Sequence, residues 1–207
     1  DQAWIQDKRQ PLLTFFPLCS TQSKTPFTKS QIKELIKLVD DQYDFILIDS
    51  PAGIDQGFQT AIEPAEEALI VVTPEVPSIR DADKVIGLLI AHGIKNNKLI
   101  INRIRPKMIK SDEMMSVTDV QNILGIPILG VIPDSEQVII ASNRGEPLVL
   151  DDKLSFPAVA FENTACRLEG QDIDLIDLNK NLTNPVKTML GNFLNRKNQK
   201  ENQDDNK

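Results

Sequence analysis

A carboxylate stands at the end of a short apolar run, where it could hold a metal ion beside a phosphate. The run 43–48 (Tyr-Asp-Phe-Ile-Leu-Ile) is rich in strand formers and is followed by Asp49. Such a carboxylate can meet a hydrated Mg²⁺, which prefers oxygen ligands, next to a nucleotide phosphate. Gly53 and Gly57 then allow a close backbone approach. The alternative is that Asp49 is a turn or cap residue, because aspartate commonly occupies such positions.

A second group of polar residues ends two further apolar runs. Asn102 closes one run, and its amide has the acceptor and donors that match the edge of adenine. Pro133 and Asp134 close the other run. Ligands of parallel sheets bind beyond the carboxyl ends of the strands, so these positions are candidates for one site. The alternatives are a loop amide at Asn102 that bonds nearby backbone and an ordinary solvated surface at the basic residues Arg103, Arg105 and Lys107.

These residues need a sheet to position them, and the hydrophobic pattern predicts one. Short apolar runs typical of strands occur at 11–18, 43–48, 68–73, 98–102 and 128–132. Between and after them lie amphipathic stretches typical of helices, at 28–39, 78–92, 116–124, 136–143 and 156–168. Three of these begin with capping pairs, Thr28 with Gln31, Ser78 with Asp81 and Ser116 with Asp119. The alternation predicts an α/β fold with a doubly wound, mostly parallel sheet.

Composition excludes several classes of function. The 207 residues carry 30 acidic against 23 basic side chains, a net charge of -7, which argues against a surface devoted to nucleic acid. The two cysteines and the single histidine form no zinc-ligand spacing and no disulfide framework. The chain also contains no Gly-x-x-x-x-Gly-Lys-[Ser/Thr] loop, which nucleotide hydrolysis on such a sheet needs to hold the phosphates. We therefore expect half of a nucleotide site.

Several ordered motifs together resemble the MinD family of septum site-determining ATPases, which have a deviant Walker A loop. The resemblance covers about residues 1–195 and is densest over 43–150. Its motifs are Asp-Ser-Pro-Ala-Gly-Ile-Asp at 49–55, Pro-Glu at 74–75, Ile-Arg-Asp-Ala-Asp at 79–83, Asn-Arg at 102–103, Met-Met-Ser-Val at 114–117 and Gly-Glu-Pro at 145–147. It implies a P-loop-type fold, ATP and Mg²⁺ as cofactors, and an N-terminally truncated chain that lacks the Walker A segment.

The resemblance assigns roles to individual residues. Asp49 is similar to the Walker B aspartate, the catalytic residue that holds Mg²⁺ through water, and Ser50, Pro51, Ala52 and Gly53 to the switch II turn. Asn102, Arg103, Pro133 and Asp134 resemble the residues that bind the nucleotide base. Arg80, Asp81 and Asp83 fall on the helix by which the family binds its partners, MinC and MinE. The alternative for that helix is a solvated charged face.

The C-terminal part of the sequence predicts an amphipathic helix. Asn184 and Pro185 are typical of a helix start. Apolar residues follow at i, i+3, i+4, i+7 and i+8, bordered by basic ones: Val186, Met189, Leu190, Phe193 and Leu194 with Lys187, Arg196 and Lys197. The resemblance implies that this is a membrane-targeting helix for an anionic surface; the alternative is that the stripe packs on the protein's own core.

Two regions and one function are therefore expected. Residues 1–178 would be the C-terminal portion of a single ATPase domain, and residues 179–207 a linker, the membrane helix and a polar disordered end. The resemblance implies a membrane-associated ATPase that selects the division site through ATP-dependent homodimerisation. The high Asn, Lys and Ile usage suits a plastid, with the protein peripheral on the inner membrane; a bacterial cytoplasm is the alternative. Other candidate functions are a non-catalytic adaptor and a DNA-partitioning ATPase, which the acidic charge disfavours.

Overall fold

The computed structural model describes residues 4–17, 27–150, 155–176 and 178. The chain divides into two compact units, Asp1–Glu66 and Glu67–Lys207. The second unit contains the parallel sheet, and each unit is described by itself below.

The sheet of the second unit has three parallel strands in the order β3-β4-β5. They are β3 (Glu67–Val72), β4 (Asn96–Ile104) and β5 (Ile128–Pro133). Each has apolar residues on both faces, as strands covered on both sides require. The predictions of strands at 68–73, 98–102 and 128–132 are confirmed, although β4 is longer than expected, with Asn96 and Asn97 before the predicted range and Arg103 and Ile104 after it.

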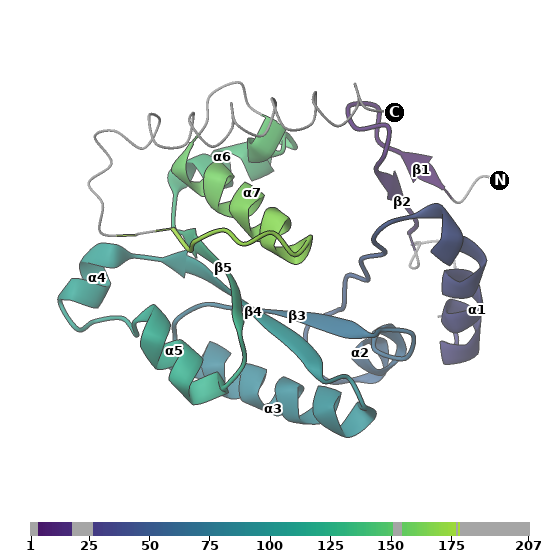
Figure 1. Ribbon diagram of the computed structural model, residues 1–207, viewed down its shortest axis with the longest axis horizontal. Helices are drawn as coiled ribbons and strands as arrows, with labels where there is room; N and C mark the ends of the chain where they lie inside the picture. The colour runs from purple at the N-terminus through teal and green to yellow at the C-terminus, as the bar shows by residue number, and fades with distance from the viewer. Residues whose placement is uncertain (1–3, 18–26, 151–154, 177, 179–207) are drawn as a thin grey trace. The chain divides into compact units, whose positions relative to one another are not determined.

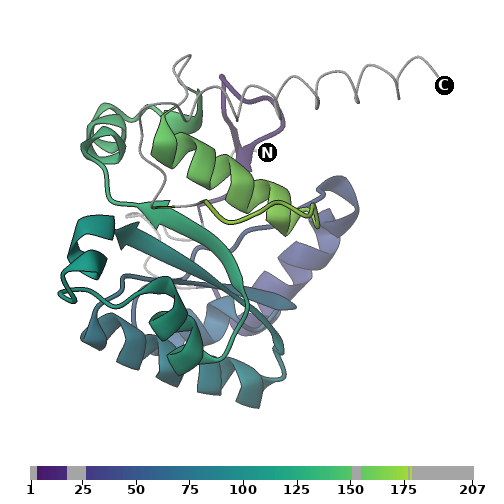
Figure 2. The same ribbon diagram turned by 60° about the vertical axis from the view of Figure 1, so that its left-hand side comes forward.

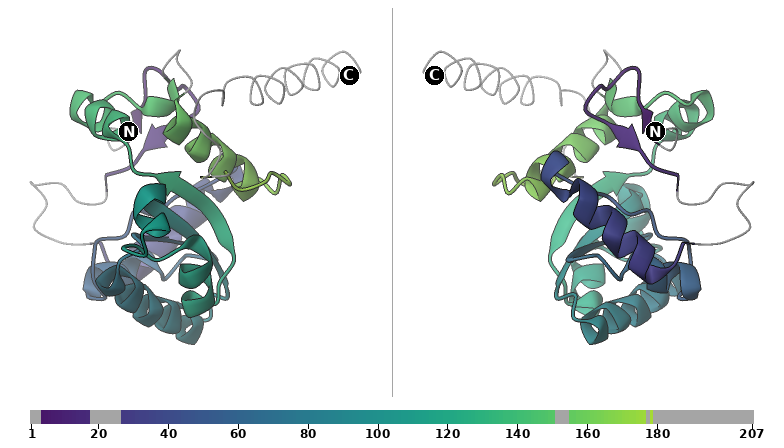
Figure 3. Two further views of the ribbon diagram at one scale, coloured as in Figure 1. Left: turned by 90° about the vertical axis from the view of Figure 1, so that its left-hand side faces the viewer. Right: turned by 90° about the vertical axis from the view of Figure 1, so that its right-hand side faces the viewer.

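Helices cover both faces of this sheet, which confirms the doubly wound α/β fold. Figures 1 and 2 show α3 (Val76–His92) and α5 (Val117–Leu124) on one face and α7 (Phe156–Leu168) on the other. The same layers are seen edge-on in Figure 3. Short helices α4 (Pro106–Lys110) and α6 (Glu136–Arg144) follow β4 and β5, and a 3₁₀ turn, η2 (Leu148–Leu150), precedes α7. The core lies in these layers, with Leu99, Ile101, Ile104 and Val120 inaccessible to solvent.

The helix ends follow the predicted capping chemistry in α5 but not in α3. Ser116 accepts from Asp119 N, the Asp119 carboxylate accepts from Ser116 N, and Gly125 ends α5 at φ +66°. The prediction that Ser78 caps α3 is wrong. The helix begins two residues earlier because Pro77 suits the first turn, and Ser78 Oγ instead accepts from Thr73 N at 3.1 Å.

The first unit contains a hairpin and two helices. Strands β1 (Ile5–Gln6) and β2 (Thr14–Phe15) pair antiparallel. Of the strand expected at 11–18, the described residues form only the two-residue strand β2, so the expected strand is present but shorter. Helix α1 (Lys29–Val39) has the expected capping box at Thr28, and η1 (Asp40–Gln42) and α2 (Gln56–Ala61) follow it. The Trp4 and Phe16 rings lie 4.7 Å apart and give the hairpin an aromatic contact.

The prediction of a buried strand at 43–48 is also wrong. This segment pairs with no strand among the described residues. Phe45 is 52% exposed and Leu47 76% exposed. The side-chain pattern reports a preference for extended backbone, but a strand also needs a neighbour for its ladder hydrogen bonds, and the pattern does not contain that information.

Candidate nucleotide-binding site

A bulge at the carboxyl end of β4 positions Asn102 and Arg103. Ile101 pairs with Val131 and Ile104 with Pro133, so two residues of β4 stand opposite one of β5. Arg103 adopts φ +58°, an unusual conformation for a residue with a side chain, which costs roughly 1–3 kcal/mol. Bulges of this kind redirect side chains at strand ends and are frequent beside binding sites.

Asp134 joins this bulge to the end of β5. Its backbone N–H donates to Ile104 O at 2.9 Å, which continues the strand pairing. Its carboxylate accepts from Arg105 Nε at 2.6 Å and from Arg103 Nε at 3.3 Å. Partial burial raises the pKa of Asp134, but the hydrogen bonds from Arg105 and Arg103 outweigh burial and hold the pKa below its ordinary value. The structure thus brings together Asn102, Arg103, Pro133 and Asp134 at one edge of the sheet.

Asn102 combines a polar amide with apolar surroundings. Its Oδ1 accepts from Arg103 N at 2.9 Å, and its side chain is half-buried. It lines a cavity of about 240 Å³ under α7, whose other walls are mostly apolar and include Leu69, Ile100 and Phe161. An amide beside an apolar wall suits a flat heteroaromatic ring, which needs both a surface to lie on and a directional hydrogen bond.

Arg105 was missed as a site residue, because a basic loop usually reads as solvated surface. It makes the shorter of the two contacts to Asp134, and its backbone N–H donates to Met114 Sδ at 3.4 Å. The sequence carried no signal for this contact, because the bulge at Arg103 interrupts the alternation of side chains along the strand. Arg105 thus takes part in holding Asp134.

Asp49 and the turn after it belong to the first unit. Asp49, Ser50, Pro51, Ala52 and Gly53 are all exposed. Gly53 has φ +92°, which favours glycine, whereas a Cβ at Gly57 would lie 2.5 Å from the Pro51 ring at Cγ, so lack of space favours glycine there. Within the described part of the chain no three His, Cys, Asp or Glu side chains gather into a metal site. One accessible carboxylate fits Mg²⁺ that keeps its waters and is bound chiefly by phosphate oxygens.

The residues expected to bind partners lie exposed on α3. Arg80, Asp81 and Asp83 face solvent, and Asp81 pairs with Lys84 at 3.3 Å. Opposite them Ile79, Ala82, Ile86 and Leu89 are buried, as the predicted stripe requires. Ile90, which the pattern placed on that stripe, is 51% exposed because it lies past the edge of the contact.

The eight residues expected to meet a membrane, at 186–197, lie outside the described residues. Of the helices that the structure does describe, none combines the length and the apolar character needed to cross a bilayer.

A parallel sheet covered on both faces, with an amide, arginines and a carboxylate at the carboxyl ends of its strands, defines an α/β nucleotide-binding domain. Residues 7–148 match the family described as the CobQ/CobB/MinD/ParA nucleotide binding domain. Over 196 residues the chain is 64% identical to an Emiliania huxleyi protein that carries the name of the septum site-determining protein MinD; the match covers 94% of this chain and 72% of that protein.

Two solved MinD structures are similar to this chain. The chain resembles the MinD in a MinC:MinD cell division complex of Aquifex aeolicus with a TM-score of 0.77 and 43% identity, covering 85% of this chain and 70% of that one. It resembles MinD of Pyrococcus horikoshii complexed with Mg-ADP with a TM-score of 0.61 and 29% identity, covering 69% and 57% of the two chains. The chain belongs to the MinD family of division-site-selecting ATPases.

Proposed function

We propose that this chain supplies the base-binding and Mg²⁺-binding parts of an ATP site that drives division-site selection. The observation that carries the proposal is the bulge at the end of β4, which sets Asn102 beside an apolar wall while Asp134 holds Arg103 and Arg105. In this proposal Asn102 hydrogen-bonds the adenine edge, with Pro133 and Arg103 beside the ring. Asp49 orients the water shell of Mg²⁺, and residues 50–53 respond to the γ-phosphate.

In this proposal the donors that bind the phosphates belong to a Gly-x-x-x-x-Gly-Lys-[Ser/Thr] loop, a sequence that does not occur among these 207 residues. In phosphoryl transfer such donors and the metal supply most of the stabilisation. We therefore propose that the 207-residue chain by itself binds ATP weakly and does not turn it over.

The test compares this chain with a fusion that adds the region of the Emiliania huxleyi relative that has no counterpart here. Fluorescent ATP binding and phosphate release are measured for both. We expect turnover in the fusion alone, and its loss in the fusion carrying Asp49→Asn, because that change is nearly isosteric and removes the charge. The matched control is Asp55→Asn, an exposed aspartate six residues along the same segment. Turnover by the 207-residue chain, or normal turnover with Asp49→Asn, would contradict the proposal.

We further propose a reversible membrane anchor at the C-terminus. Its support is the sequence pattern of five apolar residues at helical spacing with three basic neighbours. A single short amphipathic helix binds a bilayer weakly, so ATP-dependent homodimerisation would double the anchors and raise the avidity. Phe193→Glu is expected to release the protein from anionic liposomes in a sedimentation assay, whereas Asn195→Glu, outside the stripe, leaves most of it bound. Equal sedimentation of both variants would refute the anchor.

The proposed partners are MinC-like and MinE-like regulators, bound at Arg80, Asp81 and Asp83. The MinC-like partner is supported by the similarity of this chain to the MinD in a MinC:MinD complex. The choice of binding surface is supported by the exposure of these three residues on α3. The proposed location is the plastid stroma, at the inner membrane, since the Emiliania huxleyi relative is algal. Immunogold labelling of cells tests this location, and label confined to another compartment would contradict it.

A further inference from the structure

Helix α6 carries apolar side chains that nothing in the described part of the chain covers. None of its nine residues is buried, and Ile139 and Ile140 are 55% and 46% exposed. A helix of this length is marginal in water without tertiary packing. Val149 and Leu150 of η2, the turn that follows α6, are also exposed apolar residues. An apolar surface of this extent on one side of a domain commonly marks a docking site.

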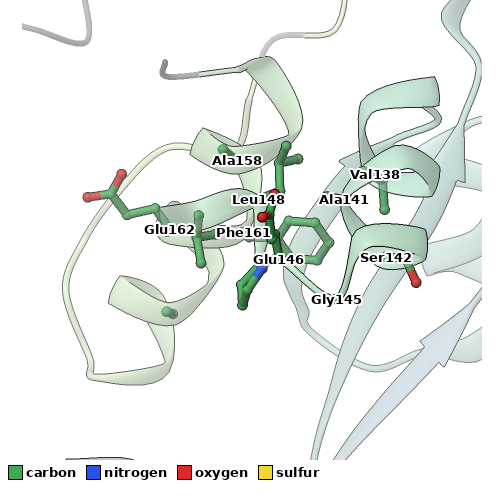
Figure 4. Close-up of a pocket in the computed structure, with 12 residues that line it drawn as sticks. Val138, Ala141, Ser142, Gly145, Glu146, Leu148, Ala158, Phe161 and Glu162 are labelled. Carbon is green, nitrogen blue, oxygen red and sulfur yellow. The ribbon is translucent and has the colours of Figure 1, made fainter. Parts of the chain in front are cut away.

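Between α6 and α7 this surface is hollowed into a groove. Its volume is about 760 Å³, and its walls come from α6, from residues 145–149 and from α7. Figure 4 shows Phe161 and Leu148 lying between the two helices, with Val138 and Ala141 opposite them on α6 and the side chain of Glu162 turned away. The groove is therefore apolar along its floor, and the acidic residue Glu146 lies in its wall.

The chain that follows α7 is held at the C-terminal end of that helix. Gly170, at φ +83°, reverses the backbone after α7. The Arg167 guanidinium then holds the chain that follows, because Nη1 donates to Ile173 O and to Asp174 O at 3.1 Å each, while Nε donates to Leu129 O at 2.5 Å. Residues 171–174 are thus fixed beside the C-terminal end of α7, one wall of the groove.

The remaining length of chain is enough to fill the groove. The roughly twelve residues from Asp174 to Val186 can span up to about 40 Å when extended. Helix α7, with thirteen residues, is about 20 Å long, so the segment starting at Val186 can reach any point of the groove. That segment has an apolar stripe for the floor, and the basic residues that border the stripe, Lys187, Arg196 and Lys197, complement Glu146.

We propose that the groove between α6 and α7 is the docking site of this chain's own segment 184–197, which leaves the groove when it binds an anionic bilayer. Docked and membrane-bound states use the same apolar stripe and exclude each other. Docking thereby keeps the monomer from binding membranes. A dimer binds because its two segments together bind the bilayer more tightly than they bind their grooves. The membrane step rests on the function proposed above; the docking step does not.

Docking is tested on the 207-residue chain without lipid. In a background with Cys19→Ser and Cys166→Ser, the pair Ser142→Cys and Leu190→Cys is oxidised mildly. We expect an intramolecular disulfide whose yield is independent of protein concentration. The matched control pairs Leu190→Cys with Gln121→Cys, an exposed position on α5 across the sheet. Equal yields from both pairs overturn the proposal, as does cross-linking only between chains, which would assign the groove to a second copy.

Hydrogen exchange gives an independent reading. Amides of α6 and η2 are expected to exchange at least about fivefold faster in Phe193→Glu than in the parent chain. A synthetic peptide of residues 184–197, added in excess to a chain ending at Leu178, should restore the slow exchange. Unchanged exchange in both comparisons overturns the proposal.

Liposome sedimentation separates docking from the anchor. Phe161→Glu, in the groove, should increase binding to anionic vesicles severalfold, because the segment is no longer held. If Phe193→Glu accelerates exchange in α6 but does not alter sedimentation, the anchor fails while docking stands. If Phe161→Glu leaves both exchange and sedimentation unchanged, docking fails.

Discussion

Gly130 of β5 lies so close to Thr164 of α7 that a Cβ at this glycine would stand 2.7 Å from Thr164 Cγ2. Thr164 is itself fixed, since it is buried and its Oγ1 donates to Ala160 O at 2.7 Å. The close contact sets the separation of α7 from the sheet. It therefore determines how the cavity beside Asn102 is closed.

Gly130→Ala is accordingly expected to destabilise the protein. The added methyl group forces α7 away from β5, and overpacking of this kind costs roughly 1–3 kcal/mol. Thermal unfolding measures the loss. The control is Gly87→Ala on α3, where a Cβ meets nothing within 4 Å and helix propensity predicts a gain of up to about 1 kcal/mol. Thr164→Ala in the Gly130→Ala background should recover part of the stability; a double variant no more stable than Gly130→Ala would show that the clash lies elsewhere.

The sequence predicted the elements whose evidence lies in their own side chains. Helix α7 and strand β5 follow from apolar periodicity, and the α5 caps follow from Ser116 and Asp119. The bulge at Asn102 and Arg103 could not be predicted, because it depends on one residue more in β4 than in β5, which is a relation between two strands. For the same reason the strand character of 43–48 did not reveal whether a partner strand lies beside it.

Part of the candidate site was predictable on different grounds. Asn102 and Asp134 were identified because they close or follow apolar runs; Asp134 directly follows β5, whereas Asn102 lies inside β4, two residues before its end. The ion pair from Arg105 was not identified, since pairing depends on side-chain directions that the bulge sets. The close contact of Gly130 with Thr164 was equally invisible, because a glycine in a strand has several explanations.

Asp134→Asn is expected to change the pH dependence of stability. In the parent chain the folded pKa of Asp134 is lowered, so its contribution is complete above the unfolded pKa of about 3.9 and is lost as the pH falls toward the folded pKa. The variant lacks this contribution at neutral pH and loses less on acidification. The pair is partly exposed, with 21% of the Asp134 side chain accessible, so the effect at pH 7 should stay below about 1 kcal/mol. Urea unfolding at pH 7 and pH 3.5 measures both values; parallel pH curves for the two proteins would contradict the assignment.

Charge reversal on α3 should separate partner binding from stability. Asp81→Lys and Asp83→Lys replace exposed carboxylates, and surface changes usually alter stability by less than about 0.5 kcal/mol. Binding of a MinC-type partner, measured by interferometry, is expected to weaken with each variant. Asp119→Lys is unsuitable as the control because it removes a cap, so Gln121→Lys on α5 serves instead. A large fall in melting temperature in the α3 variants would assign these residues a structural role.

Arg167→Met should loosen the chain that follows α7. The guanidinium donates to three carbonyl groups, of Leu129, Ile173 and Asp174, and a thioether can donate to none of them. Leaving partly buried acceptors unpaired costs about 1–3 kcal/mol, and the loss falls mainly on residues 171–174. Hydrogen exchange of that segment should therefore accelerate more than exchange in β4.

Arg167→Lys is the informative comparison, because an ammonium keeps the charge but lacks the planar fork, so it should recover only part of the protection. If Arg167→Lys protects the segment as well as arginine does, the charge and not the fork geometry holds the returning chain.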